Sequence, residues 1–197
     1  MGALTMQSKT TIVYCHPYDK SFNHQVLMTV QEKLDQLGEA YNVIDLYKDQ
    51  FDPRYSVAEL AKFKDGDTTD PLVIKYQTVL RSSTNLIIIT PIWWNDLPGM
   101  LKGFFDKVMK PQFAYINTPR GVKGRMTNIK RADVLTTSTS PTWYLKLFSG
   151  NAIKRVFMGA TLKQLGIKQR HWTNCGGITN SHFSQRQAFL KQIVNQI

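Results

Sequence analysis

The sequence predicts a single α/β domain, spanning residues 1–197, built on a doubly wound, five-stranded parallel sheet with helices on both faces. Short apolar runs rich in β-branched residues alternate with helical patterns along the chain, as such a sheet requires. The run Leu86–Ile89 is unbroken, which is typical of a strand buried on both faces. Hydrophobic residues make up 42% of the chain, enough for one sizeable core. Five strands suit the order 2-1-3-4-5, in which the ends of strands one, three and four lie side by side.

The first βα unit begins with a strand at Thr11–Cys15. Ser21 or Asn23 can cap the helix that follows, and Gly38 is a natural end for it. The second strand is expected at Tyr41–Leu46. The apolar side of the helix comprises Val26, Leu27, Val30, Leu34 and Leu37.

A polar connection over residues 47–55 leads to two further helices. Ser56–Glu59 is a capping box that opens a short helix to about Phe63, and residues 64–69 form a turn. Pro71 begins the next helix, whose apolar residues are Leu72, Ile74, Val79 and Leu80.

After the third strand, Asp96 can cap a helix whose first turn tolerates Pro98. Lys102, Asp106 and Lys110 are spaced four apart and are expected on its exposed side, before Pro111 ends it. The opposite, apolar stripe comprises Leu101, Phe104, Phe105, Val108 and Met109.

The second half predicts a long active-site loop and two more strands. Residues 112–131 show no sustained period and are interpreted as that loop, and strands follow at Ala132–Thr136 and Gln169–Cys175. Trp143–Leu147 is expected to form a turn of helix. Asn151 can cap a helix that carries Ile153, Val156, Phe157, Ala160 and Leu165 and stops at Gly166. Ser184 can cap the last helix, whose stripe is Phe189, Leu190, Ile193, Val194 and Ile197.

The composition excludes several classes of protein. No run approaches the roughly 20 apolar residues of a membrane helix, and the start lacks the pattern of a signal peptide, so a cytoplasmic protein is expected. Cys15 and Cys175 are far apart, which favours two reduced core thiols over a disulfide or a metal site. The net charge is +11, and residues 102–170 hold fourteen Lys/Arg against two Asp/Glu. This basic segment is interpreted as a solvated surface or as a region that attracts phosphate-bearing small molecules. Nucleic-acid binding is a third interpretation, but the sequence has no nucleic-acid-binding motif.

The loops after strands one, three and four are expected to meet in one crevice. The first, HPYDKSFN, precedes a helix N-terminus and could bind a phosphate, with Ser21 and Asn23 as mere caps in the alternative reading. It has no glycine, and the chain has neither the dinucleotide fingerprint nor a P-loop. The second presents Trp93 and Trp94, as a ligand platform or as core anchors. The third, Ser138–Ser140, offers hydroxyls and amides or is an ordinary turn.

Together these features suit a flavin mononucleotide, and here the sequence resembles a known family. HPYDKSFN after the first strand and PIWWNDLPGMLKGFFDKVM after the third are similar to the NAD(P)H:quinone oxidoreductase family of flavodoxin-like proteins. That family includes DT-diaphorase-like enzymes, bacterial drug-activity modulators and ancillary proteins of potassium efflux. The resemblance covers nearly the whole chain.

The resemblance assigns roles to three groups of residues. The flavin phosphate and ribityl chain would meet His16, Ser21, Phe22 and Asn23. The isoalloxazine edge would lie along Pro91, Ile92, Trp93, Trp94 and Asn95, and its pyrimidine end would face Ser138, Thr139, Ser140 and Tyr144. The catalytic candidates are Trp94, Tyr144 and Tyr115, the last as a roof of the substrate pocket.

This chain departs from the family in two places. Ser140 and Pro141 replace two glycines, and no histidine stands between His24 and His171, so a proton would come from Tyr144 or water. The longer members carry FAD and a C-terminal extension absent here, so FMN is favoured, with FAD as the alternative.

The function implied is a flavin-dependent NAD(P)H oxidoreductase that passes a hydride to a quinone or similar acceptor by a ping-pong mechanism. Members of this family are commonly dimers, so a homodimer is expected. The alternatives are a flavin-binding regulatory subunit beside a membrane transporter, a flavodoxin-like electron carrier, and a nucleic-acid-binding protein, which rests on charge alone. Carriers of electrons are usually acidic, and this chain is basic.

Overall fold

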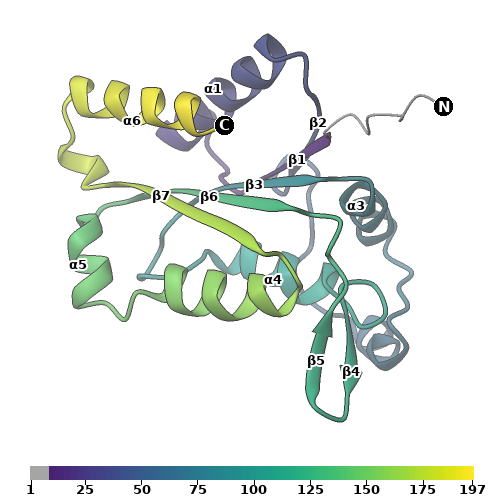
Figure 1. Ribbon diagram of the computed structural model, residues 1–197. Helices are drawn as coiled ribbons and strands as arrows, with labels where there is room; N and C mark the ends of the chain where they lie inside the picture. Colours follow the sequence, from purple (N-terminus) through teal and green to yellow (C-terminus); the bar gives the residue numbers. More distant parts are fainter. Residues whose placement is uncertain (1–8) are drawn as a thin grey trace.

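The computed structural model describes residues 9–197, so the expectation of no signal peptide falls on residues outside this range. Five parallel strands form the sheet in the order β2-β1-β3-β6-β7, which confirms the predicted fold class (Figure 1). Their bounds are β1 Lys9–Tyr14, β2 Ala40–Asp45, β3 Asn85–Pro91, β6 Arg131–Ser138 and β7 Gln169–Gly176.

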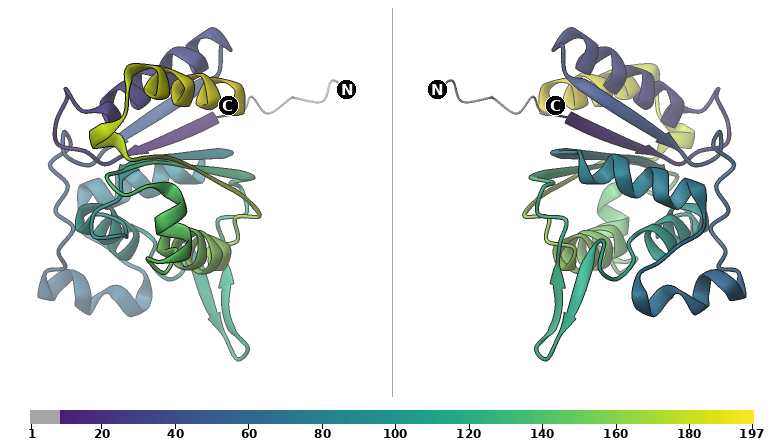
Figure 2. Two further views of the ribbon diagram at one scale, coloured as in Figure 1. Left: turned by 90° about the vertical axis from the view of Figure 1, so that its left-hand side faces the viewer. Right: turned by 90° about the vertical axis from the view of Figure 1, so that its right-hand side faces the viewer.

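Helices cover both faces of the sheet (Figure 2). On one face α1 (Phe22–Gln36) and α6 (Phe183–Gln196) pack against the side chains of β1 and β3. The other face is covered by α3 (Pro71–Arg81), α4 (Gly99–Val108) and the π-helix η2 (Ile153–Leu162), which enclose the larger of two apolar clusters. The shorter elements are α2 Val57–Ala61, η1 Phe63–Asp65, α5 Thr142–Leu147 and η3 Ile178–Asn180.

Three of the expected helix caps are wrong. Asp96 lies two residues before the N-cap of α4, Pro98, and its Oδ1 accepts a hydrogen bond from its neighbour Leu97 N at 2.7 Å. Asn151 adopts φ 55°, and η2 begins only at Ile153. Ser184 lies inside α6, where the side chain of Gln185 accepts instead from His182 N at 2.9 Å. Ser21 does cap α1, because its Oγ accepts from His24 N at 3.1 Å.

Four apolar residues that were expected in the core are exposed: Leu37, Ile74, Val156 and Ala160. Leu37 follows the last turn of α1, where the chain has left the sheet. On α3 the buried face is Val73, Tyr76 and Leu80, so Ile74 points to solvent. In η2 the wider π turn shifts the phase of the stripe and leaves Val156 outside.

Residues 112–131 are not the irregular loop that the sequence suggested. Two short strands, β4 (Tyr115–Thr118) and β5 (Gly121–Gly124), pair in antiparallel register and project from the body of the protein as a hairpin (Figures 1 and 2). Gly124 packs so closely on the end of the η2 segment that a Cβ there would lie 2.2 Å from the carbonyl carbon of Leu165. The base of the hairpin therefore packs against the chain just after η2.

The exposed position expected for Lys110 is also wrong, because its side chain is fully buried. Its ammonium donates to Glu59 Oε2 at 2.8 Å and to the carbonyl of Asp67 at 2.7 Å. Glu59 thus forms only half of the expected capping box: its amide donates to Ser56 Oγ, but its carboxylate faces Lys110, Thr68 and Thr69.

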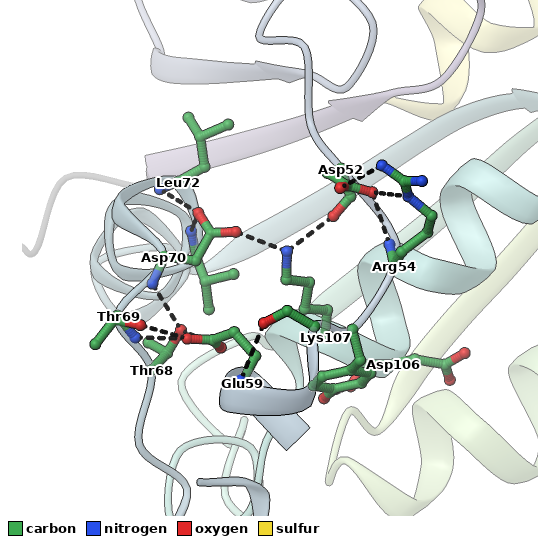
Figure 3. Close-up of polar contacts among 12 residues, drawn as sticks. Asp52, Arg54, Glu59, Thr68, Thr69, Asp70, Leu72, Asp106 and Lys107 are labelled. Atoms are coloured by element: carbon green, nitrogen blue, oxygen red, sulfur yellow. Dashed lines mark hydrogen bonds and ion pairs between the residues drawn. The ribbon is translucent and has the colours of Figure 1, made fainter. Parts of the chain in front are cut away.

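Lys107 extends this network, and Figure 3 shows it together with Asp52, Glu59 and Asp70. Its ammonium donates to Asp70 Oδ2 at 2.7 Å and to the carbonyl of Asp52 at 2.9 Å. Two buried lysines, Lys107 in the last turn of α4 and Lys110 just beyond it, thereby hold the connection over residues 52–70 against this end of the helix.

Candidate active site

The loops that follow β1, β3 and β6 meet at one edge of the sheet, as predicted. Tyr14 is level with Ile89, and Pro91 is level with Thr137. Backbone hydrogen bonds continue past the strand ends, from Cys15 N to Ile89 O at 3.0 Å and from Ile92 N to Thr137 O at 2.7 Å. This edge is the carboxyl end of the strands at the point where strand order reverses, the usual ligand position in such sheets.

The first loop brings the N-terminus of the 15-residue helix α1 to this edge. The Ser21 hydroxyl is an acceptor for His24 N, so the capping reading holds, and its own hydrogen is left to donate. His16 Nδ1 accepts from Tyr18 N at 3.1 Å, and partial burial lowers the pKa of His16. The amides of the first helical turn and the Ser21 hydroxyl are donors suited to a phosphate.

Asn23 ties the first loop to the third. Its Nδ2 donates to Thr137 Oγ1 at 2.8 Å, and the side chain is buried. Its Oδ1 is also buried and has no hydrogen-bond partner among the described residues. A buried acceptor without a partner is costly, so this atom fits a donor supplied by a ligand, such as a hydroxyl of a ribityl chain.

The second loop turns its two tryptophans outward. Trp93 and Asp96 exchange backbone hydrogen bonds of 3.0 and 3.1 Å, and between them Trp94 and Asn95 adopt φ 50° and 65°, as in a type I′ turn. Trp94 is 98% exposed and Trp93 44% exposed, so neither is a core anchor. The ring centroid of Trp93 lies 6.3 Å from that of His16, which joins the second loop to the first. Pro91 and Ile92 are buried beneath them.

The third loop is held from below by a residue that the sequence reasoning missed. Asn174 of β7 donates from Nδ2 to Ser138 Oγ at 2.9 Å and accepts from Thr136 Oγ1 at 2.7 Å. Ser138 Oγ in turn donates to the carbonyl of Ser140 at 2.7 Å. The signal available in the sequence was a polar residue, Asn174, inside the last predicted strand. Thr139 remains exposed at the tip of the loop.

Gly176 allows the third loop to approach β7. A Cβ at Gly176 would lie 2.5 Å from Thr142 N, at the start of α5.

The three catalytic candidates do not all lie together. Tyr144, on α5 just after the third loop, is partly exposed and stacks on Phe148 with ring centroids 5.8 Å apart. Trp94 stands on the second loop. Tyr115, in β4, lines a pocket that runs along α4 from Leu97, just after the second loop, to Met109. Within one chain, the structure brings Tyr115 to the hairpin and not to the edge where the loops meet.

Cysteine and metal chemistry find no support at this edge. Cys15 and Cys175 are free and buried, and burial raises the pKa of the Cys15 thiol to about 12. Over residues 9–197 no group of three or more His, Cys, Asp or Glu side chains is arranged to hold a metal ion. Nor is any helix in that range long and apolar enough to cross a bilayer.

A family model described as flavodoxin-like fold matches residues 8–197. The chain belongs to this family. Among its relatives is an uncharacterized NAD(P)H oxidoreductase of Haemophilus influenzae, 21% identical over 91% of this chain and 89% of that protein. NAD(P)H dehydrogenase [quinone] 1 of Rattus norvegicus is 27% identical over 69% of this chain, which spans only 56% of that enzyme.

Solved structures agree with this membership. The NAD(P)H:quinone oxidoreductase of Methanothermobacter marburgensis superposes with a TM-score of 0.85, at 27% identity over 96% of both chains. An FMN-dependent NADH-azoreductase of Bacillus anthracis, solved with FMN, is 18% identical over 96% of both chains and shares the fold with a TM-score of 0.77. The predicted resemblance, and the expectation of an NAD(P)H dehydrogenase-like oxidoreductase, are confirmed at the level of the family.

Proposed function

We propose that this chain is an FMN-dependent NAD(P)H oxidoreductase that passes two electrons from NAD(P)H to a quinone or a similar acceptor. The observation that carries the proposal is the outward turn of Trp93 and Trp94 beside the N-terminus of α1, at the switch point of the sheet. A fully exposed tryptophan leaves a large apolar surface in water, which is unfavourable unless a ligand covers it. The names of the relatives favour the same chemistry.

The residues of the first loop would hold the phosphate end of the cofactor. The first-turn amides of α1 and the Ser21 hydroxyl supply donors, and the helix dipole favours negative charge at that place. His16 and Phe22 flank the loop, and Asn23 Oδ1 would accept from a hydroxyl of the sugar chain. These contacts bind the cofactor and do no chemistry themselves.

The second and third loops would orient the ring and its reaction partners. A bound flavin supplies the hydride and electron transfer. Trp94 offers a flat apolar face over which a nicotinamide and then a quinone ring can stack, while Pro91, Ile92 and Asn95 line the edge beneath. Amides and hydroxyls of Ser138, Thr139 and Ser140 would stabilise negative charge at the polar end of the ring. Tyr144 is the nearest candidate to hold a proton for the acceptor.

A single site shared by both substrates has a kinetic signature. The first product must leave before the second substrate binds, so double-reciprocal plots at several fixed quinone concentrations should be parallel when NADPH is varied. Intersecting lines would mean that both substrates bind together, and would contradict the shared site.

A homodimer is the expected assembly. Trp143, Leu147 and Phe148 are exposed on and just after α5, and a second copy would cover apolar side chains of this kind. Light scattering that returns the 22.6 kDa mass of one chain at micromolar concentration would contradict this part of the proposal.

A further inference from the structure

β7 is an edge strand of the sheet (Figure 1). A cavity lies against it. Its volume is about 490 Å³. Its walls come from β6, α5, η2, β7 and α6, and none of the residues predicted to bind the cofactor lines it. The cavity is therefore distinct from the edge where the three loops meet.

Cationic side chains converge on this cavity from three elements: Lys146 of α5, Lys154 of η2 and Arg170 of β7. Over residues 9–197, no carboxylate forms an ion pair with any of the three. The NH1 group of Arg170 donates to the backbone carbonyls of Ile167 and Lys168, which fixes the position of its charge without neutralising it.

The surrounding sequence provides no compensation. Asp133 is the carboxylate closest along the chain, and it is already engaged by Arg131 at 2.6 Å and lies 3.5 Å from His171. From residue 134 to residue 197 the chain has eight Lys/Arg and no Asp or Glu. Like charges gathered around a hollow repel one another, and a bound anion would relieve that repulsion.

One wall of the cavity is preorganised. Trp172 Nε1 donates to Thr136 Oγ1 at 2.8 Å, and the Lys146 ammonium lies 5.7 Å from the centroid of the Trp172 ring. The same Thr136 hydroxyl donates to Asn174, so the indole is held in a chain of hydrogen bonds inside the sheet. Contact with a fixed aromatic face restricts the flexible lysine, which lowers the entropy lost when it binds a ligand.

We propose that this cavity binds a small polyanion with two or three adjacent phosphate groups, free or as the oligophosphate of a nucleotide. Three cations from separate elements can each meet a different phosphate, whereas one carboxylate would satisfy only one of them. The volume is within the usual range of about 300–1,000 Å³ for small-ligand sites. The site is independent of the proposed oxidoreductase activity.

The test measures binding of inorganic tripolyphosphate by calorimetry at low salt, to the full chain and to two charge-matched double variants. Lys146→Gln with Lys154→Gln removes two charges from the cavity. Lys163→Gln with Lys191→Gln removes two exposed charges that do not line it. We expect one equivalent to bind to the wild type and to the control, and at least tenfold weaker binding to the cavity variant. Ser21→Ala should bind tripolyphosphate as the wild type does, which separates this site from the cofactor loop.

Adenosine triphosphate in the same experiment distinguishes the two sources of the ligand, because tighter binding than tripolyphosphate would assign the cavity to a nucleotide. Equal losses in both double variants would mean that net charge alone attracts anions, and would overturn the proposal. Absence of saturable binding to the wild type would do the same. The proposal would also be overturned if duplex DNA bound in a way that depends on Lys146 and Lys154 while tripolyphosphate did not bind.

Discussion

At the scale of single residues, Trp94 combines two unfavourable features. Its side chain is 98% exposed, and its backbone lies in the left-handed region at φ 50°, where residues other than glycine pay a conformational cost. Neither feature helps the chain to fold. Both are understandable if the turn presents a flat ring to a ligand.

Trp94→Ala should leave folding intact and impair turnover. An exposed side chain contributes little to stability, so we expect the free energy of unfolding to change by less than about 0.5 kcal/mol. FMN should still bind, because the phosphate loop is elsewhere, while kcat/KM for quinone reduction should fall by roughly tenfold or more through lost orientation.

Trp94→Phe is the matched control, since it keeps a flat ring and should retain most of the activity. A wild-type rate in Trp94→Ala with FMN bound would locate the acceptor elsewhere and favour an electron carrier or a transporter subunit.

At the scale of elements, Lys110, just beyond the C-terminal end of α4, is one of two buried lysines that hold the connection over residues 52–70. Burial alone would raise the pKa of Glu59, but hydrogen bonds from Lys110, Thr69 and Thr68 outweigh it and lower that pKa to about 2. The ion pair therefore stabilises the fold fully above about pH 4.5, and its contribution is lost as the pH falls toward 2.

Lys110→Met should destabilise the protein by about 3–5 kcal/mol at neutral pH, because it leaves Glu59 buried without its partner. Adding Glu59→Gln should recover part of that loss. Lys102→Met breaks the exposed pair with Asp106 and should cost under about 1 kcal/mol. Urea denaturation of the three variants measures this, and similar losses for Lys102→Met and Lys110→Met would show that the buried pair has no special role.

The elements that were predictable from sequence are those with a local signal. Unbroken apolar runs such as Leu86–Ile89 reveal buried parallel strands, and the stripe on α4 was correct. Lys110 was predicted to be exposed because helical spacing cannot show that a carboxylate from a distant segment pairs with it. The β4–β5 hairpin was not predicted because its strands have only four residues each, β4 half-buried and β5 largely exposed, without apolar alternation. A π-helix changes the period that such reasoning assumes.

The candidate site was predictable to the same extent. Strand ends follow from strand order, so the meeting of the three loops could be foreseen from the pattern of elements. The support of Ser138 by Asn174 could not, because it depends on the register of β6 against β7. The role of Tyr115 rests on the family resemblance alone and stays a prediction, since the pocket that it lines also includes Leu97, just after the second loop.

At the scale of the whole molecule, the central claim is that the three loops form one FMN site. Ser21→Ala removes a phosphate donor and also the cap of α1, whereas Ser56→Ala removes an equivalent cap from α2, away from the loops. The two substitutions should therefore cost similar amounts of stability, about 1 kcal/mol each.

Titration of the protein with FMN, followed by quenching of flavin fluorescence, tests this claim most directly, with FAD titrated in parallel. We predict saturable quenching by the wild type and by Ser56→Ala, with FMN bound at least as tightly as FAD. Ser21→Ala should bind FMN about fivefold or more weakly, equivalent to about 1 kcal/mol for a lost hydrogen bond. Flavin fluorescence that stays unquenched by the wild type with both flavins would contradict the claim.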